Sequence, residues 1–266
     1  MTDIHPTAIV DPGARLGADV RVGPYCVIGA EVEVGDGCRL QHHVTLEGPS
    51  TTGAENVFYA YASIGQQSQD LKYRGEPTHL RIGDGNTFRE FVTVHRGTAP
   101  ESYTRVGSRG NFLAYSHVAH DCVVGDGVIF SNNGTIAGHV EVEDYALIGG
   151  LTAIHQYCRV GRHAITGGCS KIVQDVPPFM IADGNPATVR GVNQVGLERH
   201  GFEPESVRRL REAYRLLYRS KLNVKQAVEE IRKTLWGGRE IEQLVEFIEK
   251  SERGIIRRPV RRGEPE

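Results

Sequence analysis

The chain has 266 residues, with 31 basic and 33 acidic side chains that give a formal net charge of −2 at neutral pH. This balanced charge gives no indication of a nucleic-acid-binding protein, which usually carries a strongly basic face. No apolar run approaches the roughly 20 residues that cross a bilayer. The first residues, MTDIHPTAIVDPGARLG, lack the basic segment followed by an apolar segment that is typical of a signal peptide. We therefore expect a cytoplasmic protein whose five cysteines are reduced thiols.

An aliphatic residue recurs at every sixth position from Ile4 onward. Of the 29 such positions between 4 and 172, 24 hold Ile, Leu, Val or Phe. A small or β-branched residue often stands two positions earlier, and residues two apart in a strand face the same side, so both positions face inward. Glycine often follows the aliphatic position and marks a corner. The pattern predicts a mainly β fold, a hexapeptide parallel β-helix with three hexapeptides in each coil, in which residues 18 apart stack.

Two segments keep the six-residue register but lose its pattern. They are QSQDLKYRGEPTHLR, residues 67–81, and RGTAPESYTR, residues 96–105. Polar residues, prolines and glycines replace whole strands there, as in loops that leave a coil. Loops on a rigid scaffold often carry function, which makes both segments candidates for it.

The repeat ends near DVPPF, residues 175–179, because proline cannot continue a strand ladder. We assign residues 1–190 to the β-helix. Apolar stripes with helical spacing begin after Pro204, which predicts a helical C-terminal domain over 191–256. Residues 257–266 are expected to form a mobile tail.

The stretch FLAYSHVAHDCVVG brings together His117, His120, Asp121 and Cys122, which are residue types that bind metals. In the repeat, Cys122 takes the inward small position. Three other cysteines take the same position: Cys26, Cys38 and Cys158. His117, His120 and Asp121 face outward, so Cys122 cannot easily share a metal with them. We expect no metal site.

Stacking of residues 18 apart adds Gly138 beside His120 and His139 beside Asp121. A histidine next to a carboxylate is the arrangement of a general base with the group that orients it. A glycine amide without a side chain can stabilise an oxyanion. Outward polar residues of a repeat protein are often only solvated, but a stacked group of this composition favours the interpretation that these residues are catalytic.

Several motifs resemble a known enzyme family. They are IGQQSQDLKYRGEPT, VHRGT, SHVAHDCVVG, IAGHV, IGGLTAIHQYCRVG, GGCS, QDVPPF and GVNQVGLERHGF. Together they resemble the acyl-ACP–UDP-N-acetylglucosamine O-acyltransferases, which start lipid A synthesis, over nearly the whole chain. The resemblance implies a left-handed β-helix, a homotrimer with active sites between subunits, and no cofactor beyond acyl carrier protein as co-substrate. It also implies transfer of an (R)-3-hydroxyacyl group to the 3-hydroxyl of UDP-N-acetylglucosamine.

The same resemblance implies roles for individual residues. His120 corresponds to the catalytic base, Asp121 to its partner and Gly138 to the oxyanion donor. Positions that line the sugar and acyl site correspond to His117, His139, His155 and Gln156. Positions that meet the substrate across the subunit interface correspond to Asp70, Lys72 and His95. Positions on the nucleotide side correspond to Asn193 and Arg199.

Three further positions bear on specificity. Gly168 corresponds to the residue that measures the acyl chain, where glycine leaves room for a long chain, about myristoyl in length. Val195 stands where the family has an acidic residue and His200 where it has a second basic one. We therefore expect the nucleotide contacts to differ in detail.

The remaining polar residues are expected to have simpler roles. Five histidines are interpreted as surface or corner residues without chemistry: His5, His42, His43, His79 and His163. The arginines of the helical part are interpreted as a mainly solvated face: Arg208, Arg209, Arg211, Arg215 and Arg219. Such a cluster also suits docking of an acidic carrier protein.

Three alternatives remain open at this point. A gamma-class carbonic anhydrase is also a trimeric left-handed β-helix and holds zinc with histidines, but lacks the QDLKYRGEPT loop and the long helical part. The related N-acyltransferase of the same pathway has an extra N-terminal uridine-binding domain, whereas this repeat begins at Ile4. The third alternative is a scaffold without catalytic activity.

Overall fold

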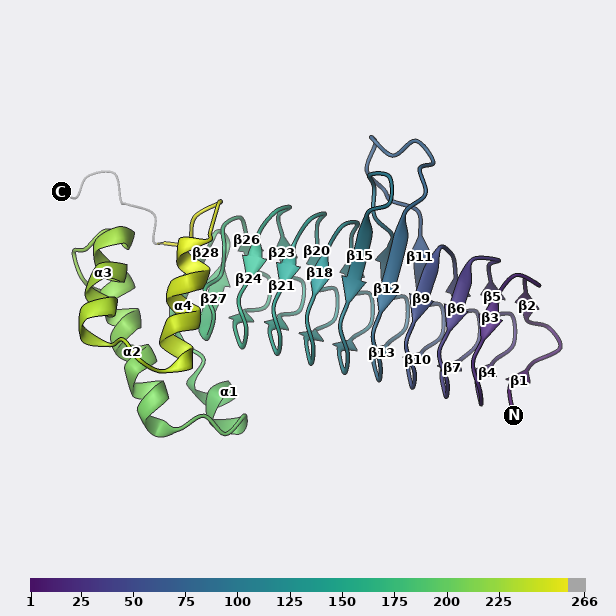
Figure 1. Cartoon of the computed structure of the whole chain (residues 1–266), viewed down its shortest axis with the longest axis horizontal. Helices are drawn as coiled ribbons and strands as arrows, with labels where there is room; N and C mark the ends of the chain where they lie inside the picture. Colours follow the sequence, from purple (N-terminus) through teal and green to yellow (C-terminus); the bar gives the residue numbers. More distant parts are fainter. Residues whose placement is uncertain (258–266) are drawn as a thin grey trace.

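Residues 1–257, which the computed structural model describes, form a column of short strands with a group of helices at its C-terminal end (Figure 1). The strands form three sheets that the chain visits in turn, so that each coil adds one strand to each sheet. Of the tail expected over 257–266, residues 258–266 lie outside the described part of the chain.

The three sheets are named A, B and C in the order in which the chain enters them. Sheet A contains β1 (Asp3–Ile4), β4 (Arg21–Val22), β7 (Arg39–Leu40), β10 (Val57–Phe58), β13 (Thr87–Phe88), β16 (Asn111–Phe112), β19 (Ile129–Phe130), β22 (Leu147–Ile148), β25 (Ile165–Thr166), β27 (Met180–Gly184) and β28 (Ala187–Val192). Sheet B contains β2 (Ile9–Val10), β5 (Val27–Ile28), β8 (Thr45–Leu46), β11 (Ser63–Gln66), β14 (Thr93–His95), β17 (His117–Val118), β20 (Thr135–Ile136), β23 (Ala153–Ile154) and β26 (Lys171–Ile172). Sheet C contains β3 (Arg15–Leu16), β6 (Val32–Val34), β9 (Ser50–Thr52), β12 (His79–Ile82), β15 (Tyr103–Val106), β18 (Val123–Val124), β21 (Glu141–Val142) and β24 (Arg159–Val160).

The core of the coil follows the six-residue repeat. Strands pair in parallel and in the predicted register, so that Val118 pairs with Ile136, eighteen residues later. Phe58, Phe88 and Phe112 are fully buried and stack in one internal column, with ring centroids 5.2 and 4.8 Å apart. The four cysteines predicted to face inward are all 0 % exposed. The inward positions therefore supply a continuous hydrophobic core.

The two polar segments leave the coil as loops between neighbouring sheets (Figure 1). Val57 pairs with Thr87, thirty positions later, and Thr87 pairs with Asn111, twenty-four later, where an ordinary coil spans eighteen. The insertions are therefore of twelve and six residues, which explains why the register survives them. The loops occupy residues 67–78 and 96–102, because β12 starts at His79 and β15 at Tyr103.

The column ends in an antiparallel hairpin of β27 and β28, after the prolines of DVPPF. Four helices follow: α1 (Gln194–Arg199), α2 (Pro204–Tyr218), α3 (Val224–Thr234) and α4 (Arg239–Glu249). Helix α2 starts with Pro204, and Asn223 caps α3 in a reciprocal pair with Gln226. No helix within residues 1–257 is long and apolar enough to cross a membrane.

One of the five histidines interpreted as surface or corner residues is buried. His163 lies at a corner, as expected, but its side chain is buried, with 6 % of the residue exposed. Its ring stacks on Tyr145 at 4.9 Å and meets Phe202 edge-on at 5.0 Å. The repeat predicted the corner position, but Phe202 comes from the segment after α1, whose packing the repeat does not specify.

Candidate active site

The outward polar residues gather at the corner where the chain passes from sheet B to sheet C. His120 and Asp121 follow β17 directly, and Gly138 and His139 take the same places one coil later, after β20. Asp121 and His139 both have a left-handed backbone, with φ of 58° and 60°. Short polar residues tolerate this conformation best, and it turns both side chains to the same edge of the column.

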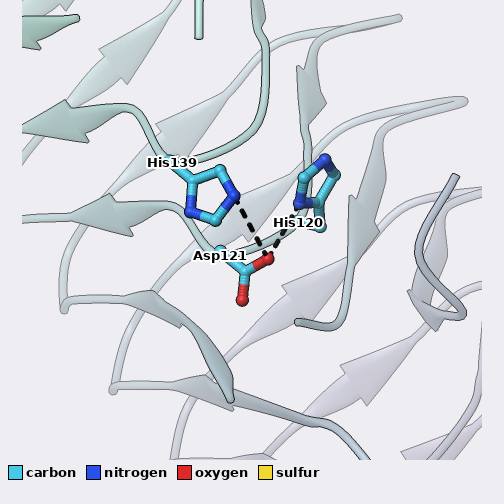
Figure 2. A group of neighbouring side chains, drawn as sticks. All are labelled: His120, Asp121 and His139. Carbon is cyan, nitrogen blue, oxygen red and sulfur yellow. Dashed lines mark hydrogen bonds and ion pairs between the residues drawn. The ribbon is translucent and has the colours of Figure 1, made fainter. Parts of the chain in front are cut away.

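One carboxylate oxygen links the two histidines (Figure 2). Asp121 Oδ2 lies 2.8 Å from His120 Nδ1 and 3.8 Å from His139 Nε2. The side chains of His120 and Asp121 are 12 % and 9 % exposed, whereas that of His139 is 36 % exposed. The first distance is a hydrogen bond in which His120 Nδ1–H donates to the carboxylate, so that Nε2 carries the free lone pair.

The second loop covers Asp121. The Thr98 N–H donates to both carboxylate oxygens, at 3.1 and 3.3 Å, and Thr104 Oγ1 accepts from the Asp121 N–H at 2.8 Å. Burial by itself raises the pKa of Asp121, but the hydrogen bond from His120, together with smaller contributions that include the Thr98 N–H and the nearby His139, outweighs it and lowers this pKa to about 2. Asp121 is therefore a carboxylate at neutral pH and favours the neutral tautomer of His120 that is protonated on Nδ1.

The first loop brings a second carboxylate to the base. Asp70 Oδ2 lies 3.9 Å from Nε2 of His120 in the same chain. The loop is fixed by its own contacts, because Asp70 Oδ1 accepts from the Lys72 N–H at 2.8 Å. Ser68 and Thr98 join the two loops through a 2.6 Å hydroxyl hydrogen bond. The free nitrogen of His120 therefore faces a small space bounded by Asp70.

Gly138 closes the other side of that space. A Cβ atom on Gly138 would lie 2.3 Å from His120 Cε1 and 2.4 Å from Nε2, which is closer than atoms can approach. Within residues 1–257, the Gly138 N–H donates no hydrogen bond. This position therefore provides room for the imidazole and an amide that is free to bind an anionic oxygen.

Comparisons with known proteins agree with this geometry. Residues 175–256 match the family model described as UDP-N-acetylglucosamine O-acyltransferase, domain 2, and residues 2–48 match the bacterial transferase hexapeptide model. The acyl-[acyl-carrier-protein]–UDP-N-acetylglucosamine O-acyltransferase of Thiobacillus denitrificans is 47 % identical over 97 % of this chain and 100 % of its own length. This chain belongs to that family.

Solved structures of similar proteins support the assignment. LpxA from Acinetobacter baumannii superposes with a TM-score of 0.92 at 43 % identity, over 96 % of this chain and 99 % of that one. The UDP-N-acetylglucosamine acyltransferase of Francisella novicida gives a TM-score of 0.93 at 37 % identity, over 96 % of this chain and 94 % of that one. The predicted left-handed parallel β-helix with C-terminal helices is confirmed, and the chain is an acyltransferase rather than a carbonic anhydrase or an inert scaffold.

Two more histidines of this family member lie beneath the loops. His95 is buried and meets the ring of His117 edge-on at 5.1 Å. Burial, and then the neighbouring His117, lower the pKa of His95 to about 4, and burial also lowers the pKa of His117. Thr93 Oγ1 lies 2.7 Å from Nδ1 of His117. Both rings are therefore neutral at pH 7 and are suited to hydrogen bonding rather than to ion pairing.

The next coil along the same corner carries His155 and Gln156, which are both exposed. His155 Nδ1 lies 3.2 Å from the Gln156 carbonyl oxygen. Tyr157 stacks on His139 at 4.6 Å and extends the surface toward these residues. Sheet B, the first loop and this corner thus bring together nine predicted site residues: Asp70, His95, His117, His120, Asp121, Gly138, His139, His155 and Gln156.

Of the other predicted residues, Lys72 lies in the first loop, whereas Gly168 and Asn193 lie at other corners of the column. Gly168 lies between β25 and β26, where sheet A passes to sheet B, and a Cβ there would have only the Gly150 oxygen nearby, at 3.5 Å. Asn193 caps α1 by accepting from the Gly196 N–H, and its Nδ2 donates to the His163 carbonyl at 2.8 Å, where sheet C passes to sheet A. Within one chain Gly168 and Asn193 do not join His120.

Three other residues of α1 complete the predicted set. Arg199 is in the last turn of α1 and is exposed, and Val195 is 59 % exposed. His200 ends the helix, and its ring lies 4.8 Å from that of His163. The two departures from the family pattern therefore lie on the same short helix, which is held at both ends against the corner of His163.

The sequence did not single out the residues that hold the site together. Thr98, Ser68 and Thr93 position Asp121, the two loops and His117 through hydrogen bonds. Thr98 belongs to the VHRGT motif and Ser68 to IGQQSQD, so the motifs marked the right segments. Spacing alone cannot identify these partners, because the loops interrupt the eighteen-residue stacking.

Proposed function

We propose that this acyltransferase moves an (R)-3-hydroxyacyl group from acyl carrier protein to the 3-hydroxyl of UDP-N-acetylglucosamine, with His120 as the general base. In this proposal the reaction is the first step of lipid A biosynthesis and takes place in the cytoplasm. One observation carries the proposal: the hydrogen bond between His120 Nδ1 and Asp121, which leaves Nε2 free beside Gly138.

The proposed reaction steps follow from the protonation of His120 on Nδ1 and the ionised state of Asp121. His120 Nε2 takes the proton of the sugar 3-hydroxyl while that oxygen attacks the thioester carbonyl carbon. The carbonyl oxygen becomes an oxyanion, which accepts a hydrogen bond from the Gly138 N–H. The tetrahedral intermediate then expels the carrier's thiolate, which receives the proton from Nε2. Asp121 stabilises the imidazolium between these two transfers.

The neighbouring residues would bind and orient the sugar and acyl groups. Asp70, Lys72 and His95 reach the site from the first loop and the second sheet, and His117 and His139 border the base. Asn193 and Arg199 would bind the nucleotide from α1 of another copy, and Gln156 and His155 extend the acceptor surface. The open space at Gly168 suits a long acyl chain.

A homotrimer would bring the three corners together. Each corner carries part of the predicted set. The corner between sheets B and C carries the base His120, the corner between sheets A and B carries Gly168, and the corner between sheets C and A holds α1. The corners of one column are separated by whole strands, so a single chain cannot close the site, whereas copies packed side by side can.

The outward faces of sheets B and C differ in a way that supports such packing. Outward positions of sheet B are almost all small or uncharged: Ile9, Val27, Thr45, Ser63, Thr93, His117, Thr135, Ala153 and Lys171. Outward positions of sheet C are mainly charged: Arg15, Glu33, Thr51, Arg81, Arg105, Val123, Glu141 and Arg159. Interface cores are depleted in charge, so we assign sheet B to the subunit contact and sheet C to solvent.

The carrier protein would dock on α2. A cavity of about 360 Å³ lies between the hairpin and α2, and Arg211, Arg215 and Arg219 line one side of it. Arg208 already pairs with Glu205 and Glu212, whereas within residues 1–257 no carboxylate pairs with the three lining arginines. Arg211 already donates to the side-chain oxygen of Gln194, so Arg215 and Arg219 are the two arginines most available for an acidic partner.

Charge reversal tests this docking surface. The double variant Arg215→Glu and Arg219→Glu should raise the KM for acyl carrier protein at least tenfold without changing the KM for UDP-N-acetylglucosamine. Lys225→Glu with Lys233→Glu, on α3, is the matched control. An unchanged KM for the carrier protein would show that it docks elsewhere.

The function itself is tested by mass-spectrometric assay of transfer from 3-hydroxyacyl carrier proteins of increasing chain length to UDP-N-acetylglucosamine. We expect an ester-linked product and the highest rate with a chain about as long as 3-hydroxymyristoyl. A clear preference for a ten-carbon donor would contradict the role of Gly168, and transfer only to a 3-amino acceptor would contradict the ester product.

Mixed oligomers test the shared site. A His120→Ala chain and an Arg199→Ala chain should each be weakly active alone, and refolding them together should restore part of the activity in sites that combine the two intact corners. Activity that stays at the level of the separate variants would place each site within one chain.

A further inference from the structure

Although the sequence led us to expect no metal site, His120, Asp121 and His139 lie where they could act together as metal ligands. His120 Nδ1 and His139 Nε2 both face Asp121 Oδ2, at 2.8 and 3.8 Å, from two successive coils (Figure 2). The three ligand atoms lie within 4.8 Å of one another. Ligand atoms about 2.0–2.1 Å from a tetrahedral zinc ion lie roughly 3.3 Å apart, so sub-ångström shifts of these side chains would enclose the ion.

We infer that Zn²⁺ binds to His120, Asp121 and His139 and reversibly switches off acyl transfer. The inference deepens the proposed function and rests on it, because it assigns an inhibitory ion to the same base. Two imidazoles and a carboxylate leave a fourth zinc position open, as in sites that retain water or bind a small ligand.

Access and rigidity both suit an exchanging ion. The His139 side chain is 36 % exposed, so the ion can reach the carboxylate from this side without opening the loops. The His139 ring is held by a parallel stack on Tyr157, at 4.6 Å and 5°. Thr98 fixes Asp121 through its N–H. The ligands are therefore close to their binding positions beforehand, and ordering them costs little.

Cys122 does not belong to this set, although it follows Asp121 directly. Its side chain is fully buried in the coil, and the thiol donates to the Ala137 carbonyl at 3.1 Å. Burial raises the pKa of Cys122 to about 12. A thiolate is the form that binds metals, so the site offers nitrogen and oxygen ligands only.

Zinc would inhibit by moving one proton within His120. In the metal-free protein the single proton of the neutral imidazole is on Nδ1, where Asp121 accepts it. When Nδ1 binds zinc, the proton must move to Nε2, and no proton is gained or lost. Nε2 then has no lone pair for the sugar hydroxyl, and Asp121 is occupied by the ion. The base is lost while the space for the acyl chain remains open.

Metal binding is measured first on the untagged full-length protein without substrates, by equilibrium dialysis against Zn²⁺ and by the visible absorption of Co²⁺ in its place. We expect one ion per chain and a tetrahedral Co²⁺ spectrum. His139→Gln should weaken binding by more than the 10- to 100-fold that loss of an outer partner typically costs. His79→Gln is the matched control, because His79 pairs with Glu101 at 3.1 Å but belongs to no such three-ligand group within residues 1–257.

Inhibition is then measured by the acyl-transfer assay at the zinc concentrations found to saturate the site. Activity should fall at least tenfold and return on chelation, and His139→Gln should require a correspondingly higher zinc concentration. The inference is overturned if Zn²⁺ does not bind, if His139→Gln and His79→Gln bind it equally well, or if the saturated protein remains active. The dialysis needs no catalysis, so a failure to bind leaves the role of His120 as base unaffected.

Discussion

Two corners of the column use the same backbone conformation for different purposes. Where sheet A passes to sheet B, left-handed residues from successive coils stack as an exposed ladder of aromatic rings: Tyr25, His43, Tyr61, Phe91 and Tyr115. Where sheet B passes to sheet C, the equivalent residues are Asp121, His139 and Tyr157, and two loops reach toward them.

The comparison separates what the repeat supplies from what the loops add. The repeat places one side chain above another at each corner, and this is sufficient to stack rings or to place a histidine beside a carboxylate. A base also needs a fixed, partly dry environment, and of these two corners only the one between sheets B and C has Thr98 and Asp70 around it. The catalytic corner therefore differs from the aromatic one in its insertions rather than in its fold.

Among the variants that keep His120, Gly138→Ala should damage the catalytic corner most severely. The new methyl group would lie 2.3 Å from the His120 ring and force the ring away from the Gly138 amide that stabilises the oxyanion, so kcat should fall by about 10²- to 10³-fold. In a His120→Ala background the same change should have a much smaller effect, because the clash is gone. Equal effects in the two backgrounds would show that Gly138 does not act through His120.

Asp121→Asn tests the group that orients the base. An amide nitrogen facing Nδ1 would favour the wrong tautomer, so kcat should fall by about 100-fold with little change in the KM for UDP-N-acetylglucosamine. Circular dichroism and oligomeric state serve as controls for folding. A fall in kcat/KM caused by KM alone would make Asp121 a substrate ligand instead.

His163 provides a third corner in which burial changes a histidine without making it a base. Burial, and then the nearby His200 and Arg162, lower the pKa of His163 to about 4, and Asp144 only partly offsets them. The unfolded chain binds a proton below about pH 6.5 and the folded protein does not until about pH 4, so stability is complete above pH 6.5 and falls across this window. The loss attributable to His163 is up to about 3 kcal/mol.

His163→Phe should remove that part of the acid sensitivity, because phenylalanine keeps the stack on Tyr145 and cannot be protonated. Urea unfolding at pH 7 and pH 4.5 measures the difference, and His43→Phe on the exposed ladder serves as the control. The same loss of stability in wild type and His163→Phe would show that other groups cause it.

The smallest effect is expected on the aromatic ladder. Phe91 stacks between Tyr61 and Tyr115, with centroids 4.9 and 4.8 Å away, and each such contact contributes about 1 kcal/mol. Phe91→Ser should lower the free energy of unfolding by about 2 kcal/mol and weaken the proposed oligomer, with kcat unchanged where that oligomer is intact. Analytical ultracentrifugation and thermal unfolding measure both effects. A loss of kcat with the oligomer intact would place this ladder in the active site.

The six-residue repeat made the column and its inward face predictable, because one backbone geometry recurs and each coil adds the same contacts. It also predicted Gly138 beside His120 and His139 beside Asp121, since stacking is local. The approach of Asp70 to His120 could not be derived in this way, because the loop path depends on hydrogen bonds such as that between Ser68 and Thr98. The burial of His163 depended on packing of the segment after α1, which has no repeat.

The most direct test of the account compares two histidines that each face a carboxylate. His120 pairs with Asp121 at 2.8 Å at the catalytic corner, and His79 pairs with Glu101 at 3.1 Å outside it. In the mass-spectrometric transfer assay, His120→Ala should lower kcat by about 10²- to 10⁴-fold, with the oligomeric state and the melting temperature unchanged. His79→Ala should stay within about twofold of wild type. Transfer by His120→Ala at near the wild-type rate would contradict the assignment of the base.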